Sequence, residues 1–194
     1  RVPGGTAVAA VRTAEALAER DDIELVGLTA RHGGITPDND LVNFPAGIPV
    51  ASSRLPRPLL YEFWHQLHRP RVEGMVDSLD VVHASGGAVP ATRRPLVATV
   101  HDLAWRRHPE ASTFRGRRMF EHWLSDARRA DLVTCPSEAT KRELVEAGFN
   151  EERLRIVPLG VRADRAVLPE AEVAVRSVLR QHHVDGPFVL WVGT

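Results

Sequence analysis

The stretch Val97-Ala98-Thr99-Val100-His101-Asp102-Leu103 decides the fold. It opens as an apolar, β-branched run, which predicts a strand buried in a parallel sheet, and then ends at an imidazole beside a carboxylate. Ligands of open parallel sheets bind beyond the carboxyl ends of the strands. We therefore expect His101 and Asp102 to face a ligand. The alternative is a strand-end histidine satisfied by backbone and solvent, with Asp102 starting the next turn.

Strand-like and helix-like segments alternate on both sides of this stretch. Short β-branched runs predict strands, and longer runs with apolar residues at helical spacing predict helices. The predicted strands cover residues 23–29, 81–84, 96–100, 132–135 and 155–159, and the predicted helices cover residues 6–20, 59–79, 115–130 and 137–148. This alternation requires crossover connections, and therefore a parallel sheet with helices on both faces. The predicted fold class is α/β and Rossmann-like.

Four residues are expected to set the ends of these helices. Thr6 and Ser137 carry hydroxyls suited to N-caps. Pro70 should break or kink the helix predicted over residues 59–79, because proline has no backbone N–H to donate. Gly148 lacks a Cβ and therefore suits the left-handed position that follows a helix.

The pattern changes after Gly160. A linker precedes a predicted helix from Pro169 to His182, with proline at a favoured first position, and an apolar strand then covers residues 188–192. Nothing in this chain would cover that strand, so we expect the chain to be cut just inside a following domain. The predicted domains are residues 1–162 and the beginning of a second domain over residues 163–194.

Composition excludes several classes of protein. The 25 basic and 25 acidic side chains cancel, so no global field attracts nucleic acid. The single cysteine, Cys135, forms no internal disulfide and indicates a reducing compartment, so we expect a cytoplasmic protein. No apolar stretch reaches the ~20 residues that span a bilayer. Arginine replaces lysine almost everywhere, with Lys141 the only lysine, which is typical of a GC-rich bacterial genome.

A glycine-rich turn precedes the first predicted helix. At Pro3-Gly4-Gly5-Thr6, backbone N–H groups and the positive end of the helix would receive a phosphate or carboxylate. The dinucleotide-binding pattern needs G-x-G-x-x-G and an acidic residue after the second strand, whereas Thr29 is followed by Ala30 and Arg31. The sequence therefore argues against an NAD-dependent dehydrogenase.

Three separated motifs follow one another along the chain. They are Gly4-Gly5 before the first helix, Val100-His101-Asp102-Leu103 with Pro109 beyond it, and residues 132–138 (LVTCPSE) followed by Ile156-Val157-Pro158-Leu159-Gly160-Val161. In this order they resemble the N-terminal half of a group 1 glycosyltransferase of the GT-B fold, in the retaining class that uses nucleotide sugars. The terminal Leu190-Trp191-Val192-Gly193-Thr194 is similar to the first strand of that family's second domain.

The resemblance implies two Rossmann-like domains facing each other across a cleft, with the sugar nucleotide held by the second and the acceptor by the first. It implies that His101 hydrogen-bonds the transferred sugar, with Asp102 either orienting His101 or closing its loop. The further substrate-binding residues are Gly4, Gly5 and Thr6 at the phosphate or acceptor, Ser137 near the cleft and Gly160 at the hinge. His83, at the end of the preceding strand, would line the acceptor pocket or be a structural strand-end histidine.

The implied reaction transfers a hexose, for example mannose, from GDP-mannose or a UDP-hexose to an acceptor hydroxyl of a glycan or a lipid-linked molecule. It uses no cofactor and no obligatory metal, and the sequence has no clustered His and Cys ligands. Most residues that grip the donor would lie in the second domain, so we expect the 194-residue segment alone to be inactive. The alternative is a non-enzymatic module that binds a sugar or nucleotide without turnover.

Five arginines gather in a region with Glu110 as its only carboxylate: Arg106, Arg107, Arg115, Arg117 and Arg118. They would form a patch for an anionic acceptor or for lipid headgroups, and the alternative is a solvated helix face. Tyr61 and Trp64 lie near further arginines and would rest on the inner face of a membrane, although core packing explains them as well. The expected partners are a nucleotide sugar and an acceptor, with peripheral membrane contact as an open alternative.

Overall fold

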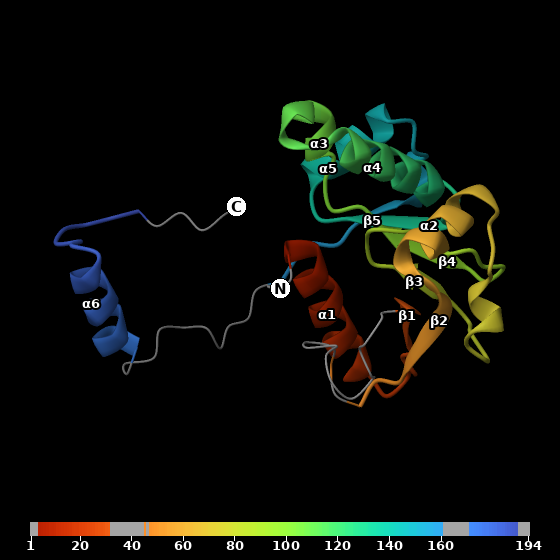
Figure 1. Cartoon of the computed structure of the whole chain (residues 1–194), viewed down its shortest axis with the longest axis horizontal. Helices are drawn as coiled ribbons and strands as arrows, with labels where there is room; N and C mark the ends of the chain where they lie inside the picture. Colours follow the sequence, from red (N-terminus) through yellow and green to blue (C-terminus); the bar gives the residue numbers. More distant parts are fainter. Residues whose placement is uncertain (1–3, 32–44, 46, 161–170, 190–194) are drawn as a thin grey trace. The chain divides into compact units, whose positions relative to one another are not determined.

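The computed structural model describes residues 4–31, 45, 47–160 and 171–189 (Figure 1). Most of the predicted loop after Arg31, the linker before the last helix and the end of the terminal strand lie outside these residues. The chain divides into two compact units, Arg1–Leu159 and Gly160–Thr194. Each unit is described by itself. That the second unit begins a nucleotide-sugar domain stays a prediction.

All strand pairs among the described residues of the first unit are parallel, as predicted. A four-stranded sheet has the order β3-β4-β5-β6, and a two-stranded sheet pairs β1 with β2. The strands are β1 (Gly27–Arg31), β2 (Val50–Pro56), β3 (Val82–Ala84), β4 (Leu96–Thr99), β5 (Leu132–Cys135) and β6 (Leu154–Ile156). Because the strands are parallel, their carboxyl ends meet at one edge of each sheet.

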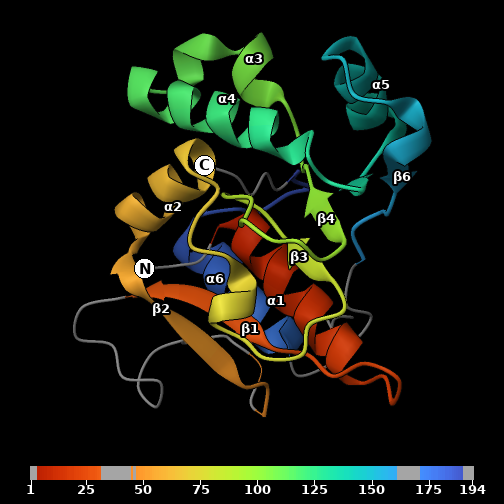
Figure 2. The same cartoon turned by 90° about the vertical axis from the view of Figure 1, so that its right-hand side faces the viewer.

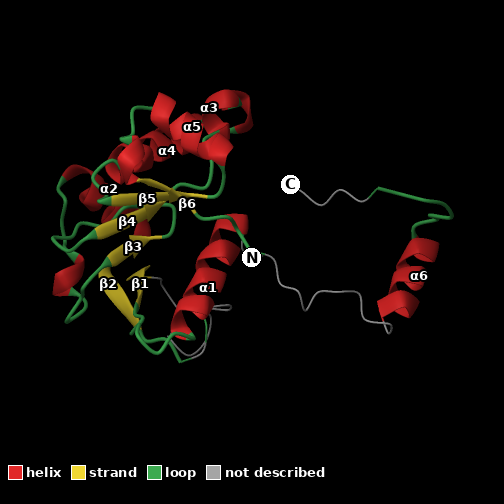
Figure 3. Ribbon diagram, turned by 180° about the vertical axis from the view of Figure 1, so that it is seen from behind, coloured by secondary structure: helices red, strands yellow, loops and turns green. Residues whose placement is uncertain are grey.

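Helices lie on both sides of the four-stranded sheet, with α3, α4 and α5 on one side and α1 on the other (Figures 1 and 3). The helices of the first unit are α1 (Gly5–Ala18), α2 (Arg57–Gln66), α3 (Ala104–Arg107), α4 (Phe114–Ala127) and α5 (Glu138–Glu146), with short 3-10 turns at η1 (Val72–Gly74), η2 (Pro109–Ala111) and η3 (Glu151–Arg153). The second unit contains α6 (Ala171–Gln181). The predicted Rossmann-like α/β class is confirmed.

One face of the four-stranded sheet carries the main hydrophobic core. Side chains alternate along each strand, so Ala98 on β4 and Val133 on β5 are buried side by side. Helix α4 covers this core with Trp123 and Leu124. On the opposite face the same alternation leaves polar side chains only partly covered, and His83 is the most accessible residue of β3. The pleat therefore separates a buried packing face from a less buried face that carries His83, Thr99 and Thr134.

The helix ends follow the predicted chemistry in two of four places. Ser137 caps α5 by accepting a hydrogen bond from the backbone N–H of Thr140 at 3.2 Å, and Gly148 adopts a φ of +86° after that helix. The prediction of Thr6 as an N-cap is wrong, because Gly4 is the N-cap and its carbonyl accepts from the N–H groups of Ala7 and Val8.

The predicted length of the helix over residues 59–79 is wrong. Helix α2 ends at Gln66, where the chain leaves helical geometry as His68 takes a φ of +51°, and Pro70 lies in the following turn. Trp64 donates its Nε1–H to the Pro70 carbonyl at 2.8 Å and is only 6% exposed. Trp64 therefore packs in the core, which removes the main apolar anchor of the predicted membrane contact.

Strand β2 was not predicted. Its sequence contains two serines and an arginine and ends in proline, so it lacks the β-branched pattern that signals a strand. It forms by pairing with β1, and this pairing also sets the start of β1 at Gly27, opposite Val50. The predicted strand over residues 155–159 is likewise shorter, because β6 pairs with β5 only as far as Ile156. Of the predicted terminal strand, the described residues Phe188 and Val189 form no strand.

Candidate functional site

Polar side chains meet at the carboxyl edge of the four-stranded sheet. His83 on β3 bonds through Nε2 to the Thr99 hydroxyl at 2.7 Å, and the Thr99 hydroxyl bonds to the Thr134 hydroxyl at 2.7 Å. The register places Thr99 directly opposite Thr134, so this ladder crosses β3, β4 and β5. We call these three residues, together with His101, the strand-end site.

The His101 ring contacts a backbone carbonyl. Its Nε2 lies 3.2 Å from the carbonyl oxygen of Ser85, which follows β3. A carbonyl only accepts hydrogen bonds, so this contact requires a proton on Nε2, and in the corresponding neutral tautomer Nδ1 carries a lone pair. Nδ1 makes no hydrogen bond to any of the residues that the structure describes. Among the described residues, therefore, only the Nε2 side of the ring has a hydrogen-bond partner.

Gly86 brings the first helix to this site. A Cβ built on Gly86 would lie 2.7 Å from Cγ2 of Thr6 and 3.7 Å from Cδ2 of His101, and Gly86 has a φ of +142°. Both the close approach and the backbone conformation require glycine. The glycine-rich turn before α1 and the His101 loop, about 95 residues apart in the sequence, are thus neighbours in the structure.

The environment of His83 disfavours its charged form. Partial burial lowers the pKa of His83 below its ordinary value of 6.5, and the nearby His101 lowers it further. Neutral His83 accepts or donates one hydrogen bond through Nε2, which Thr99 satisfies. The strand-end site therefore combines two imidazoles that interact electrostatically, each with one ring nitrogen already engaged.

Asp102 closes its own loop. Its Oδ1 accepts a hydrogen bond from the backbone N–H of Ala104 at 2.9 Å, at the start of α3. Among the described residues it makes no hydrogen bond to His101. Of the two alternatives for Asp102, orienting His101 or closing the loop, this geometry fits the second.

The remaining predicted substrate-binding residues have different surroundings. No atom lies within 4 Å of a Cβ built on Gly4, Gly5 or Gly160, so these positions are open. The Ser137 hydroxyl is occupied in capping α5 and also contacts the Thr140 hydroxyl at 3.1 Å. Capping accounts for Ser137 without a substrate. Its neighbour Cys135 is buried, and burial raises the pKa of its thiol.

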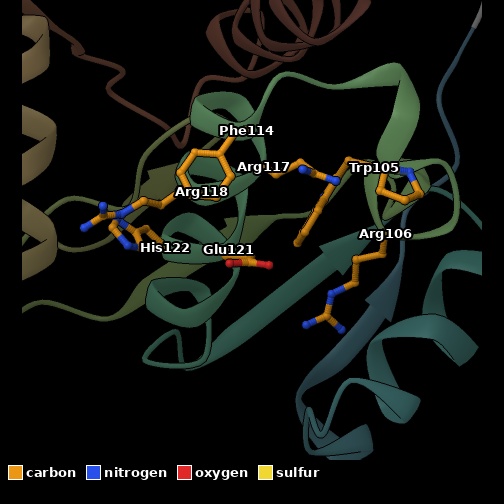
Figure 4. A pocket seen from close by; sticks show the side chains of 8 residues that line it. Trp105, Arg106, Phe114, Arg117, Arg118, Glu121 and His122 are labelled. Carbon is orange, nitrogen blue, oxygen red and sulfur yellow. The ribbon is translucent and has the colours of Figure 1, made fainter.

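The structure divides the five predicted arginines. Arg106, Arg117 and Arg118 line a pocket of about 510 Å³ beside α3 and α4 (Figure 4). Arg107 instead forms an ion pair with Glu143 on α5 at 3.1 Å. Arg115 is exposed on α4 and does not line the pocket. We call the cavity the helix pocket, and its other walls include Trp105, Pro109, Phe114, Glu121 and His122.

Metal ligands do not gather in the described part of the chain. No group of three or more His, Cys, Asp or Glu side chains there is arranged to hold a metal ion. The sequence also contains one Asp-x-Asp pattern, Asp38-Asn39-Asp40, which lies outside the described residues. No helix among the described residues is long and apolar enough to cross a membrane.

Sequence reasoning missed Thr99 and Thr134 of the strand-end site, and it missed Ser85 and Gly86, which contact His101. Thr99 and Thr134 belong to strands whose alternation could have assigned them to one face. The carbonyl of Ser85 and the close approach at Gly86 depend on tertiary contacts, although Ser85-Gly86-Gly87 signals a turn in the sequence.

Parallel sheets with helices on both faces and polar side chains at the strand ends are the architecture of the Rossmann-like domains of GT-B glycosyltransferases. Crystal structures of Anabaena Alr3699/HepE share this fold at 20% sequence identity, with TM-scores of 0.54 for the complex with UDP-glucose and 0.55 for the complex with UDP and glucose. The chain belongs to Glycosyltransferase Family 4, because its residues 3–165 match that family.

The likeness to the HepE structures concerns part of those proteins. It covers 92% of this chain and 47% of the HepE chain, so the chain spans about half the length of those proteins. No curated protein matches this chain significantly. The family and the fold are therefore established, and the substrates are a matter for proposal.

Proposed function

We propose that the chain is the acceptor-side half of an enzyme that transfers a hexose from a nucleotide sugar to an acceptor hydroxyl, with retention of configuration. The observation that carries this proposal is His101, oriented by the Ser85 carbonyl with Nδ1 available to a ligand. Membership of Glycosyltransferase Family 4 supports the reaction class, and the UDP-glucose and UDP complexes of HepE support a nucleotide-sugar donor.

The chemistry of transfer suits the strand-end site. Charge develops on the sugar ring and on the leaving phosphate, so preorganised polar groups contribute more than a strong general base. His101 accepts a hydroxyl hydrogen bond from the transferred sugar and fixes the orientation of its ring. The N–H groups at the start of α1, which the Thr6–Gly86 contact brings to the same region, face a phosphate or the acceptor.

The donor belongs to the other half of the enzyme in this proposal. Residues 163–194 begin the nucleotide-sugar domain, and Gly160 lies at the hinge between the two halves. The hexose is mannose or glucose, carried by GDP or UDP, and the reaction needs no metal. The acceptor is a glycan or a lipid-linked hydroxyl, and the reaction takes place in the cytoplasm.

Release of nucleoside diphosphate tests this function. The natural full-length protein is incubated with UDP-glucose or GDP-mannose and a mixture of glycan acceptors, with and without EDTA. We expect EDTA-insensitive release from one donor, and NMR of the product should show the anomeric configuration of that donor. Tight donor binding without release would instead favour the non-enzymatic binding module, and an inverted product would contradict retention.

A further inference from the structure

We propose that the helix pocket is a binding site for a phosphorylated sugar or polyol. It lies beside α3 and α4, its walls begin four residues after His101 at Trp105, and its volume of about 510 Å³ is within the range of small-molecule sites. The inference goes beyond the proposed transfer reaction, because it concerns binding by residues outside the strand-end site.

The charge of the helix pocket favours an anion. Three guanidiniums line it against one carboxylate, Glu121. Arg117 and Arg118 form no ion pair with any residue in the described part of the chain, so their charges are not neutralised internally. The Arg106 guanidinium stacks over the Trp105 ring at 5.4 Å from its centroid, which limits its motion. Planar guanidiniums of this kind recognise phosphate oxygens through paired N–H donors.

The other walls of the helix pocket suit a ligand that carries hydroxyls and an apolar ring face. Figure 4 shows Glu121 between Arg118 at one end and Arg106 at the other. A carboxylate repels a bare phosphate but accepts hydrogen bonds from sugar hydroxyls. Phe114 is 76% exposed, so its ring is available to pack on the apolar C–H groups of a sugar or polyol. A ligand with both a phosphate and neighbouring hydroxyls satisfies all of these walls, whereas inorganic phosphate satisfies only the arginines.

Contacts with α2 hold the side of the pocket that α4 forms. His122 stacks on His65 of α2 with ring centroids 3.9 Å apart, and Nδ1 of His65 lies 2.9 Å from Oδ2 of the buried Asp126 (Figure 2 shows α2 beside α4). The other carboxylate oxygen of Asp126 is 3.7 Å from Nε of Arg129. A wall held in this way loses little freedom on binding, which favours affinity for a small ligand.

A soluble ligand fits the pocket better than a membrane surface does. The carboxylate of Glu121 inside the pocket would face an anionic lipid layer unfavourably, and Trp64, the aromatic anchor expected nearby, is buried. A phosphorylated polyol is also the headgroup of some lipids, so the test must separate the soluble ligand from the lipid.

Isothermal titration of the chain with glucose 6-phosphate, glucose and inorganic phosphate tests the proposal. We expect glucose 6-phosphate to bind at least about tenfold more tightly than either fragment, since both halves of the ligand gain hydrogen bonds. The double variant Arg117→Gln/Arg118→Gln should weaken this binding at least about tenfold. The matched control is Arg115→Gln, on the same helix but outside the pocket, which should change the affinity less than about twofold. Glu121→Gln should narrow the preference for glucose 6-phosphate over inorganic phosphate.

Three results would overturn the proposal, provided that thermal melts show the variants folded. The first is an equal loss of affinity for glucose 6-phosphate in the double variant and in Arg115→Gln. The second is that inorganic phosphate binds as tightly as glucose 6-phosphate. The third is that glucose 6-phosphate does not bind at millimolar concentration. Co-sedimentation with phosphatidylglycerol vesicles that depends on Arg117 and Arg118, without soluble binding, would assign the pocket to a membrane instead. Because binding is measured directly, none of these results depends on transferase activity.

Discussion

The strand-end site and the helix pocket lie close in the sequence but are built in different ways. At the strand ends, sheet register and a backbone carbonyl fix each side chain, and the hydrogen bonds form a continuous ladder from His83 to Thr134. In the helix pocket, three long arginine side chains line a hollow, and none of them forms an ion pair with a described residue. The first arrangement is suited to orienting a reacting group, and the second to attracting an anion.

Replacing His101 should have the largest effect on turnover. In the natural full-length protein, His101→Ala should lower the rate of sugar transfer by about 100-fold or more, because it removes an oriented polar group from the reacting centre. Its Tm should stay nearly unchanged, since the ring is only partly buried. His108→Ala, an exposed histidine in the same segment, is the control and should transfer sugar normally. A large fall in Tm with activity retained would mean that His101 is structural.

Replacing Gly86 should have the largest effect on stability. Gly86→Ala should reduce the free energy of unfolding by about 2–3 kcal/mol, because its Cβ would overlap the Thr6 methyl and its φ of +142° is unfavourable for alanine. Gly87→Ala has a positive φ but open space and should cost about 1 kcal/mol. Denaturant titration measures the free energy of unfolding of both variants. Equal losses in Gly86→Ala and Gly87→Ala would show that α1 does not pack tightly against the strand-end site.

Breaking the support of the helix pocket should have a smaller effect. Asp126→Ala leaves His65 without its carboxylate partner and should lower the free energy of unfolding by about 1–2 kcal/mol. It should also weaken glucose 6-phosphate binding, since the His65–His122 stack would lose its anchor. Asp22→Asn disrupts an exposed ion pair with Arg20 and should leave stability unchanged. An affinity for glucose 6-phosphate that Asp126→Ala leaves unchanged would show that the His65–Asp126 contact does not hold the helix pocket in shape.

The smallest effect is a pH dependence at the strand-end site. Because the folded-state pKa of His83 lies below 6.5, the unfolded chain binds its proton more readily than the folded one. The stability contributed by neutral His83 is complete above pH about 6.5 and falls as the pH drops from there toward the folded-state pKa. We expect His83→Gln to reduce this loss in denaturant titrations between pH 7 and pH 5, and an unchanged slope would contradict the assignment.

Features set by local sequence patterns could be predicted from the sequence, whereas features set by tertiary contacts could not. The motif ending in His101, the parallel sheet and the cap at Ser137 all follow from local patterns, and the structure confirms the sheet and the cap. Strand β2 forms through its pairing with β1, so its polar sequence carries no such pattern. Likewise, local charge groups five arginines, but only the three-dimensional path of α3 and α4 separates Arg107 and Arg115 from the pocket.

The protonation state of His101 tests the central claim most directly. A long-range proton–nitrogen NMR correlation of the labelled chain at pH about 8, where free imidazole is neutral, identifies which ring nitrogen carries the proton. The bond to the Ser85 carbonyl predicts a proton on Nε2 and an unprotonated Nδ1 that is available to a sugar hydroxyl. A proton on Nδ1 would contradict the orientation of His101 and, with it, the role assigned to the strand-end site.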